Sequence, residues 1–142
     1  LHALNQTKIT PDKVVILQPT SPLRLARHID EAVNLLSSAW DAVISISEVQ
    51  LSPYKMYRLE GEKLLPFVEN CVQGVPRQQL PKVYRDSGAV YVTWHKVLTE
   101  MNSIRGKNYR SYYINPEYAV DIDTNIDLKL AEVILRDREN LG

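Results

Sequence analysis

The feature that most constrains the fold is a short, uninterrupted apolar run near the start of the chain. Val14-Val15-Ile16-Leu17 is aliphatic and mostly β-branched, and after Gln18 it is ended by Pro19. A run of this kind, bounded by a turn residue, is typical of a strand that is covered on both faces. We therefore expect a central, parallel strand at residues 14–18.

A helix and a second strand follow at the spacing of a crossover connection. After the loop, apolar residues recur at helical intervals, at Ile29, Ala32, Val33 and Leu36. Residues 41–47 then form another largely apolar run. The first 47 residues therefore predict one strand–loop–helix–strand unit, with its loop at the carboxyl end of the first strand. Open α/β sheets bind their ligands at that end.

The middle of the chain, at about residues 50–113, has a different pattern. It predicts a hairpin over 55–67 with a turn at Gly61, a strand at 89–94 and a short helix over 96–101. The region is also rich in large side chains, namely Tyr54, Met56, Tyr57, Tyr109, Tyr112 and Tyr113. This composition fits an insert that packs against a partner subunit, and packing within the same chain is the alternative.

The last segment alternates and then becomes helical. Residues 118–123 alternate between apolar and polar positions, as an extended segment does. Thr124-Asn125-Ile126-Asp127 resembles a capping box, and the apolar spacing after it predicts a C-terminal helix. Because no linker is long enough to divide the chain, we expect a single α/β domain over residues 1–142.

Composition narrows the classes of function. The 17 Lys and Arg residues balance 17 Asp and Glu residues, so nucleic acid is not an expected partner. The longest apolar stretches have four residues, too few to span a membrane. Cys71 is alone and is expected to be structural, and the first residues carry no signal-peptide pattern. We therefore expect a cytoplasmic protein. His28 has no other histidine or cysteine at metal-ligand spacing, and we expect it to lie on the polar side of its helix.

Two carboxylates precede the C-terminal helix. Asp121 and Asp123 are two positions apart, so an extended backbone would project both side chains from one face. Like charges at that separation share a proton or bind a cation, and Mg²⁺ held by carboxylates and substrate phosphates is the simplest arrangement. The alternative is that Asp123 or Thr124 caps the helix while Asp121 faces water.

Other polar groups follow the first strand and precede the strand at 89–94. Residues 18–24 carry an amide, two hydroxyls and a guanidinium, which suit a sugar or a nucleotide; an ordinary turn is the alternative. Arg77 and Arg85 suit a bidentate grip on carboxylate or phosphate, with surface salt bridges as the alternative. Lys55 is by default a solvated lysine.

Four segments together resemble the acylneuraminate cytidylyltransferases, the CMP-sialic acid synthetase family. They are residues 17–24 (Leu-Gln-Pro-Thr-Ser-Pro-Leu-Arg), 76–81, 87–91 and 121–124, which occur in the family's order and at its spacing. The resemblance implies a Rossmann-like nucleotidyltransferase sheet with flanking helices and a β-rich dimerisation insert at about 50–113. It also implies that a homodimer transfers CMP from CTP to a nine-carbon keto sugar acid, with Mg²⁺ as cofactor and pyrophosphate as product.

The resemblance also implies roles for individual residues. Asp121 and Asp123 match the metal-binding carboxylates, Gln18 matches an amide that contacts the sugar, and Arg77 matches an arginine that meets the sugar carboxylate. Lys55 matches a lysine that reaches the same carboxylate across the dimer. The remaining expected substrate-binding residues are Tyr91, matching an aromatic from the partner subunit, and Ser21, Arg24, Gln78, Arg85 and Ser87.

The chain departs from the family pattern in three places. Ser87-Gly88-Ala89 stands where the family usually has Asn-Gly-Ala, and Ile104-Arg105 stands where sialic acid enzymes place paired aromatics. Legionaminic or pseudaminic acid therefore suits this chain as well as N-acetylneuraminic acid does. Nothing matches the family's N-terminal nucleotide loop, so we expect that part to be missing and the chain alone to be weakly active or inactive. The alternative function is a non-catalytic remnant that binds sugar or dimerises.

Overall fold

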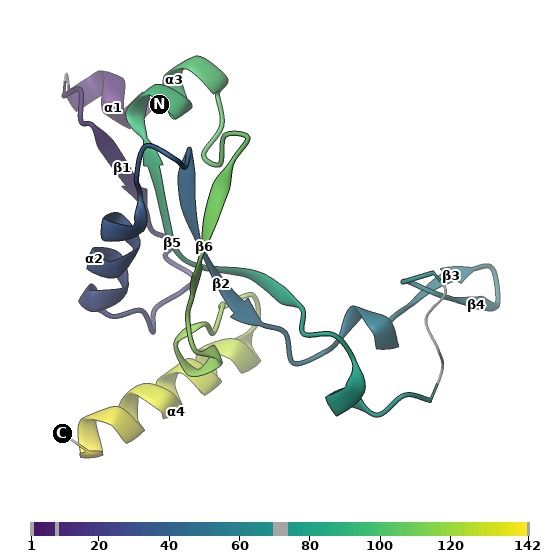
Figure 1. The fold of residues 1–142 in the computed structure, drawn as a ribbon. Helices are drawn as coiled ribbons and strands as arrows, with labels where there is room; N and C mark the ends of the chain where they lie inside the picture. The colour runs from purple at the N-terminus through teal and green to yellow at the C-terminus, as the bar shows by residue number, and fades with distance from the viewer. Residues whose placement is uncertain (1, 8, 70–73, 142) are drawn as a thin grey trace. The chain divides into compact units, whose positions relative to one another are not determined.

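The computed structural model describes residues 2–7, 9–69 and 74–141, and its fold is α/β (Figure 1). Its larger sheet is mixed and has the strand order β1 (Lys13–Ile16), β5 (Tyr84–Trp94), β2 (Ala42–Glu48) and β6 (Tyr109–Tyr113). A two-stranded antiparallel sheet consists of β3 (Tyr57–Glu60) and β4 (Lys63–Pro66). The helices are α1 (His2–Thr7), α2 (Ala26–Leu35), α3 (His95–Met101) and α4 (Asn125–Leu141). Among the described residues, no helix is both long and apolar enough to cross a membrane.

The chain divides into two compact units. The first unit, Leu1–Ser47 with Asp86–Gly142, holds the four-stranded sheet, and the second unit, Glu48–Arg85, holds the β3–β4 hairpin. The second unit covers the first part of the predicted insert at about 50–113. Most of β5, all of α3 and all of β6 also fall within that range, yet they belong to the first unit. A role of the insert in dimerisation stays a prediction.

The predicted strand–loop–helix–strand unit is present as β1, α2 and β2. Figure 1 shows α2 alongside the larger sheet, and its Ala32 and Leu36 are buried in the core with Val43 of β2. Strand β6 pairs in parallel with β2, from Ala42 opposite Tyr109 to Ile46 opposite Tyr113. The helical spacing thus predicted the face of α2 that packs on the sheet.

The expected environment of the first strand is wrong. Strand β1 stands at the edge of the described sheet and pairs antiparallel with β5, and its Val15 is 36% exposed. The reason is that β5 occupies the place between β1 and β2. Strand β5 has 11 residues, of which those from Ser87 to Thr93 are buried, so it forms the centre of the sheet.

The segment before α4 is also less regular than its alternation predicts. A 3₁₀ turn at Pro116–Tyr118, capped by the Asn115 side chain, ends at the first residue of the predicted segment, and residues 119–123 form no strand. The predicted capping box is confirmed, because the Thr124 N–H donates to Asp127 Oδ2 at 2.7 Å and the Asp127 N–H donates to Thr124 Oγ1 at 3.4 Å. Hydrogen bonds from Thr124 lower the pKa of Asp127. Cys71 lies outside the described residues.

His28 is buried, contrary to its expected place on the polar side of the helix. Only 5% of the residue is exposed, and its Nδ1 accepts the Leu25 N–H at 3.2 Å, which caps α2. The ring meets Tyr118 edge-on, with 5.0 Å between centroids, and lies 6.4 Å from the ring of Tyr112. Burial is the main cause that lowers the pKa of His28, with a further contribution from Arg27.

This burial predicts a pH-dependent stability. Because the folded state lowers the pKa of His28 below its unfolded value of about 6.5, the unfolded state binds a proton more readily. The free energy of unfolding is therefore expected to fall as the pH drops below about 6.5, until the folded pKa is reached. Urea denaturation between pH 5 and pH 7.5 measures this slope, which His28→Asn is expected to flatten.

The matched control is His2→Asn, because His2 is an exposed histidine. It is expected to keep the slope of the unsubstituted protein. An equal slope for His28→Asn and the unsubstituted protein would contradict this account of His28.

Candidate functional site

The loop after β1 packs directly onto the start of the buried part of β5. The Gln18 N–H donates to the Gly88 carbonyl at 3.4 Å, and Ser21 Oγ donates to the Ser87 carbonyl at 3.2 Å. Gly88 has φ +72°, and a Cβ atom placed on it would lie 2.2 Å from Gln18 Oε1 and 2.6 Å from Ser21 Oγ. Glycine is therefore required twice at this position, for its conformation and for its size. The exposed Gln18 side chain extends over the bare backbone that Gly88 leaves.

Two serines that were expected to bind substrate have partners inside the chain. Ser87 is fully buried, and its Oγ donates to Ser45 Oγ at 2.7 Å. Ser45 Oγ accepts the Val90 N–H at 2.8 Å, which links β2 to β5. Ser21 is also fully buried. In this structure both expected residues shape the loop and its support, and their hydroxyls do not face solvent.

Arg24 also points into the loop. Its Nη1 donates to the backbone carbonyls of Gln18 at 2.7 Å and Ser21 at 2.9 Å, and it lies 3.4 Å from the carbonyl of Ala89. Burial lowers the pKa of the Arg24 guanidinium. The structure thus places Arg24 beside Gln18, with Nη1 bonded to backbone oxygens.

The segment that holds the two predicted carboxylates is tied to the same loop. The Ile122 N–H donates to the Thr20 carbonyl at 2.8 Å, so the residues on either side of Ile122 lie beside the loop. Asp121 Oδ1 is buried and has no hydrogen-bond partner among the described residues. Asp123 is exposed. A buried carboxylate oxygen without a donor suits a cation or a ligand donor, because leaving it unpaired is costly.

Charged side chains around Tyr91 extend this region. Tyr91 is 5% exposed in β5, where burial, followed by the carboxylate of Asp86, raises the pKa of its hydroxyl. Asp86 forms an ion pair with Arg105, and Asp121 also acts electrostatically on Tyr91. Sequence reasoning missed Asp86 as a functional candidate. No local pattern points to it, because its partner Arg105 lies 19 residues away.

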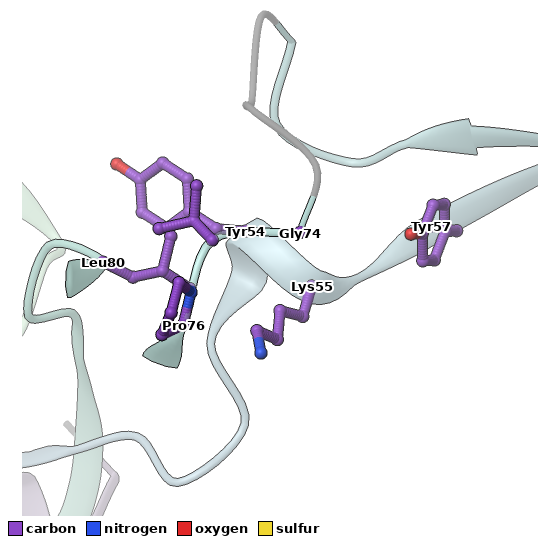
Figure 2. Close-up of a pocket in the computed structure, with 7 residues that line it drawn as sticks. Tyr54, Lys55, Tyr57, Gly74, Pro76 and Leu80 are labelled. Atoms are coloured by element: carbon purple, nitrogen blue, oxygen red, sulfur yellow. The ribbon is translucent and has the colours of Figure 1, made fainter. Parts of the chain in front are cut away.

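The cationic residues expected at the sugar carboxylate lie in the second unit. A cavity of about 420 Å³ is lined by residues that include Tyr54, Lys55, Tyr57, Gly74, Pro76 and Leu80 (Figure 2). A second cavity, of about 330 Å³, includes Arg77, Gln78, Leu80 and Lys82. The structure thus brings Arg77 and Gln78 to one cavity and Lys55 to another, with Leu80 lining both. Arg85 lines neither of these two cavities.

The residues predicted to form the site are divided between the two units of the chain. The first unit brings together Gln18, Ser21, Arg24, Ser87, Tyr91 and Asp121. The second unit holds Lys55, Arg77, Gln78 and Arg85. Among the described residues, no group of three or more His, Cys, Asp and Glu side chains is placed to hold a metal ion. Any metal here would need ligands beyond the two aspartates.

The contact at Gly88 leads to a stability prediction. Gly88→Ala is expected to destabilise the protein by about 3 kcal/mol, because a left-handed alanine is strained and its Cβ also clashes with Gln18 and Ser21. Gly61→Ala is the matched control, since Gly61 has φ +62° and no atom within 4 Å of the place that a Cβ would take. It is expected to cost about 1 kcal/mol.

Chemical denaturation of both variants makes the comparison. Equal losses for Gly88→Ala and Gly61→Ala would show that the close approach of the loop contributes nothing beyond the backbone strain.

Comparison with known proteins confirms the predicted resemblance. No family model matches the chain. An N-acylneuraminate cytidylyltransferase of Streptococcus agalactiae serotype V is 32% identical over 114 residues, which are 80% of this chain and 28% of that protein. N-acylneuraminate cytidylyltransferase A of Danio rerio is 30% identical over 123 residues, 85% of this chain and 28% of that protein. A CMP-N,N'-diacetyllegionaminic acid synthase of Legionella pneumophila is 26% identical over 138 residues, 95% of this chain and 59% of that protein.

The chain is therefore homologous to the N-acylneuraminate cytidylyltransferases over most of its own length. It spans less than a third of the length of those proteins.

Proposed function

We propose that this chain forms part of an enzyme that transfers CMP from CTP to a nonulosonic acid and releases pyrophosphate. One observation carries the proposal: the loop that contains Gln18 packs against Gly88, and the segment that contains Asp121 is hydrogen-bonded to the same loop. Homology to the cytidylyltransferases supports the reaction type. Because the chain covers only 28% of its Streptococcus relative, the activity is proposed for the protein that contains this chain.

Asp121 and Asp123 are the proposed ligands of Mg²⁺. Asp121 Oδ1, buried and without a hydrogen-bond partner among residues 2–7, 9–69 and 74–141, fits this role, and the exposed Asp123 leaves a second carboxylate accessible. Two carboxylates suffice when substrate phosphates complete the coordination. When bound, Mg²⁺ would offset the negative charge that develops on the phosphates during transfer.

The proposed reaction is an in-line displacement at phosphorus. The anomeric hydroxyl of the sugar acid attacks the α-phosphate of CTP and a new O–P bond forms, while the hydroxyl O–H bond and the α–β phosphoanhydride bond break, so that a proton passes to solvent and pyrophosphate leaves. The Gln18 amide orients the sugar, since an amide both donates and accepts hydrogen bonds without titrating. Arg77 and Lys55, both in the second unit of the chain, would bind the sugar carboxylate, with Lys55 supplied by the partner subunit of a homodimer.

The exposed apolar side chains of the hairpin favour a second candidate function. Leu59 of β3 is 73% exposed and Leu64 of β4 is 60% exposed, which suits a hairpin that packs against another subunit. A non-catalytic module that dimerises or binds sugar is the alternative. Separate titrations with CTP and with N-acetylneuraminic acid distinguish the two: binding of CTP supports the transferase, and binding of the sugar alone supports the alternative.

The metal proposal predicts the effect of Asp121→Asn. Pyrophosphate release from CTP and a nonulosonic acid is expected to fall roughly 100-fold or more, because an amide is a poor ligand for Mg²⁺. The assay uses the protein that contains this chain, over a range of Mg²⁺ concentrations. Asp30→Asn is the matched control, because Asp30 is an exposed carboxylate on α2. Unchanged turnover and Mg²⁺ dependence in Asp121→Asn would contradict the proposal.

A site to which two subunits contribute predicts that two inactive variants restore activity when they form mixed dimers. If Lys55 acts across a homodimer, Lys55→Ala and Asp121→Asn subunits are each nearly inactive alone. Half of the dimers in an equal mixture are mixed, and each mixed dimer has one intact site, so about a quarter of the wild-type activity is expected to return. Pyrophosphate release after co-refolding measures it, with light scattering to confirm the dimer. No recovery in a dimeric mixture would place Lys55 and Asp121 in the same subunit's site.

A further inference from the structure

We infer that Arg24 is a positioning residue, which holds residues 17–24 against β5 through backbone carbonyls and does not itself bind the phosphates. We call residues 17–24 the site loop. The family resemblance groups Arg24 with the substrate-binding residues, so this inference changes its role. Its catalytic consequence rests on the proposed function, whereas its structural part can be measured without any substrate.

One nitrogen atom of Arg24 makes all three of its contacts with backbone carbonyls. Nη1 of Arg24 lies 2.7 Å from the Gln18 carbonyl, 2.9 Å from the Ser21 carbonyl and 3.4 Å from the Ala89 carbonyl. The nitrogen carries two hydrogens, so the two short bonds use both and the longer contact is shared. One guanidinium group thereby joins the start of the site loop, its middle and the adjacent strand.

The surroundings of Arg24 fit a structural use of its charge. Within the described part of the chain Arg24 forms no ion pair, and its half-buried side chain bonds to backbone oxygens. Burial lowers the pKa of the guanidinium, as it does for a cation held away from water. A cation that served mainly to attract a soluble anion would gain from remaining exposed.

The contacts also explain how Arg24 would act on the site through other residues. Gln18 carries both the carbonyl that Arg24 binds and the side chain that extends over Gly88. Thr20, between the two carbonyls bound most closely, accepts the Ile122 N–H and so holds the segment that contains Asp121. A change at Arg24 would therefore displace Gln18 and Asp121 together.

The test is Arg24→Lys, which keeps the charge but replaces the planar fork by a single ammonium nitrogen. Amide hydrogen exchange of Ser21 and Ile122 is expected to become about 10-fold faster in the substrate-free protein. The Gln18 carbonyl, which accepts the Ser21 N–H, loses its bond to Arg24, and the Thr20 carbonyl, which accepts the Ile122 N–H, lies between the two carbonyls that Arg24 binds most closely. Exchange at Val43 in the buried strand β2 is expected to stay unchanged, which reports that the variant is folded. Arg136→Lys, at an exposed arginine of α4, is the matched control.

Kinetics of the protein that contains this chain supply the second measurement. A positioning role predicts that kcat of Arg24→Lys falls about 10-fold or more while KM for CTP changes less than about 3-fold. Unchanged exchange at Ser21 and Ile122, together with a raised, salt-dependent KM and a normal kcat, would overturn the inference and make Arg24 a phosphate-binding residue. If no transfer activity is found, the proposed function fails, and the exchange experiment still decides the structural role of Arg24.

Discussion

The close approach of residues 17–24 to the backbone of Gly88 is the contact on which the candidate site depends. Gly88 combines a left-handed conformation with a surface that has no room for a Cβ atom. The Gln18 amide occupies that space, and the buried Ser21 and Ser87 fill the interior beneath it. Ser87 in turn bonds to Ser45 of β2. The position of the loop is thus set by the central strands, and the Asp121 segment follows the loop through one hydrogen bond from Ile122.

The structure shows which of the cations in this charge-balanced chain are engaged in contacts within the protein. A protein with equal numbers of acidic and basic residues has no general basic surface, so anion binding must depend on individually placed cations. The structure commits some of these cations to internal contacts: Arg24 bonds to backbone carbonyls, and Arg105 pairs with Asp86. Lys55 and Arg77 are exposed and line cavities of the second unit, where Arg77 Nη2 also donates to the Val49 carbonyl at 3.4 Å. These two exposed cations are the ones proposed to bind the sugar carboxylate.

Local patterns predicted local structure well, and they failed where distant residues decide the outcome. The helix α2, the β3–β4 hairpin and the Thr124–Asp127 capping box each depend on residues a few positions apart, which the sequence displays directly. The place of β1 at a sheet edge depends on where β5 inserts, and the apolar run at 14–17 contains no information about that. For the same reason the burial of His28 was not predicted, because Tyr112 and Tyr118, whose rings it meets, come from other elements.

The unpartnered oxygen of Asp121 has a physical cost that argues for function. Burying an acceptor without a donor costs about 1–3 kcal/mol, and a protein selected for stability alone would place a donor there or a smaller residue. The Thr20–Ile122 hydrogen bond holds the segment that contains this carboxylate against the loop. Strained backbone and buried polar atoms without hydrogen-bond partners concentrate at functional sites, where the surrounding structure keeps them in place. The loop contact at Gly88 and the buried oxygen of Asp121 are therefore linked through the Thr20–Ile122 hydrogen bond, so the strand that positions the loop also positions the carboxylate proposed to bind Mg²⁺.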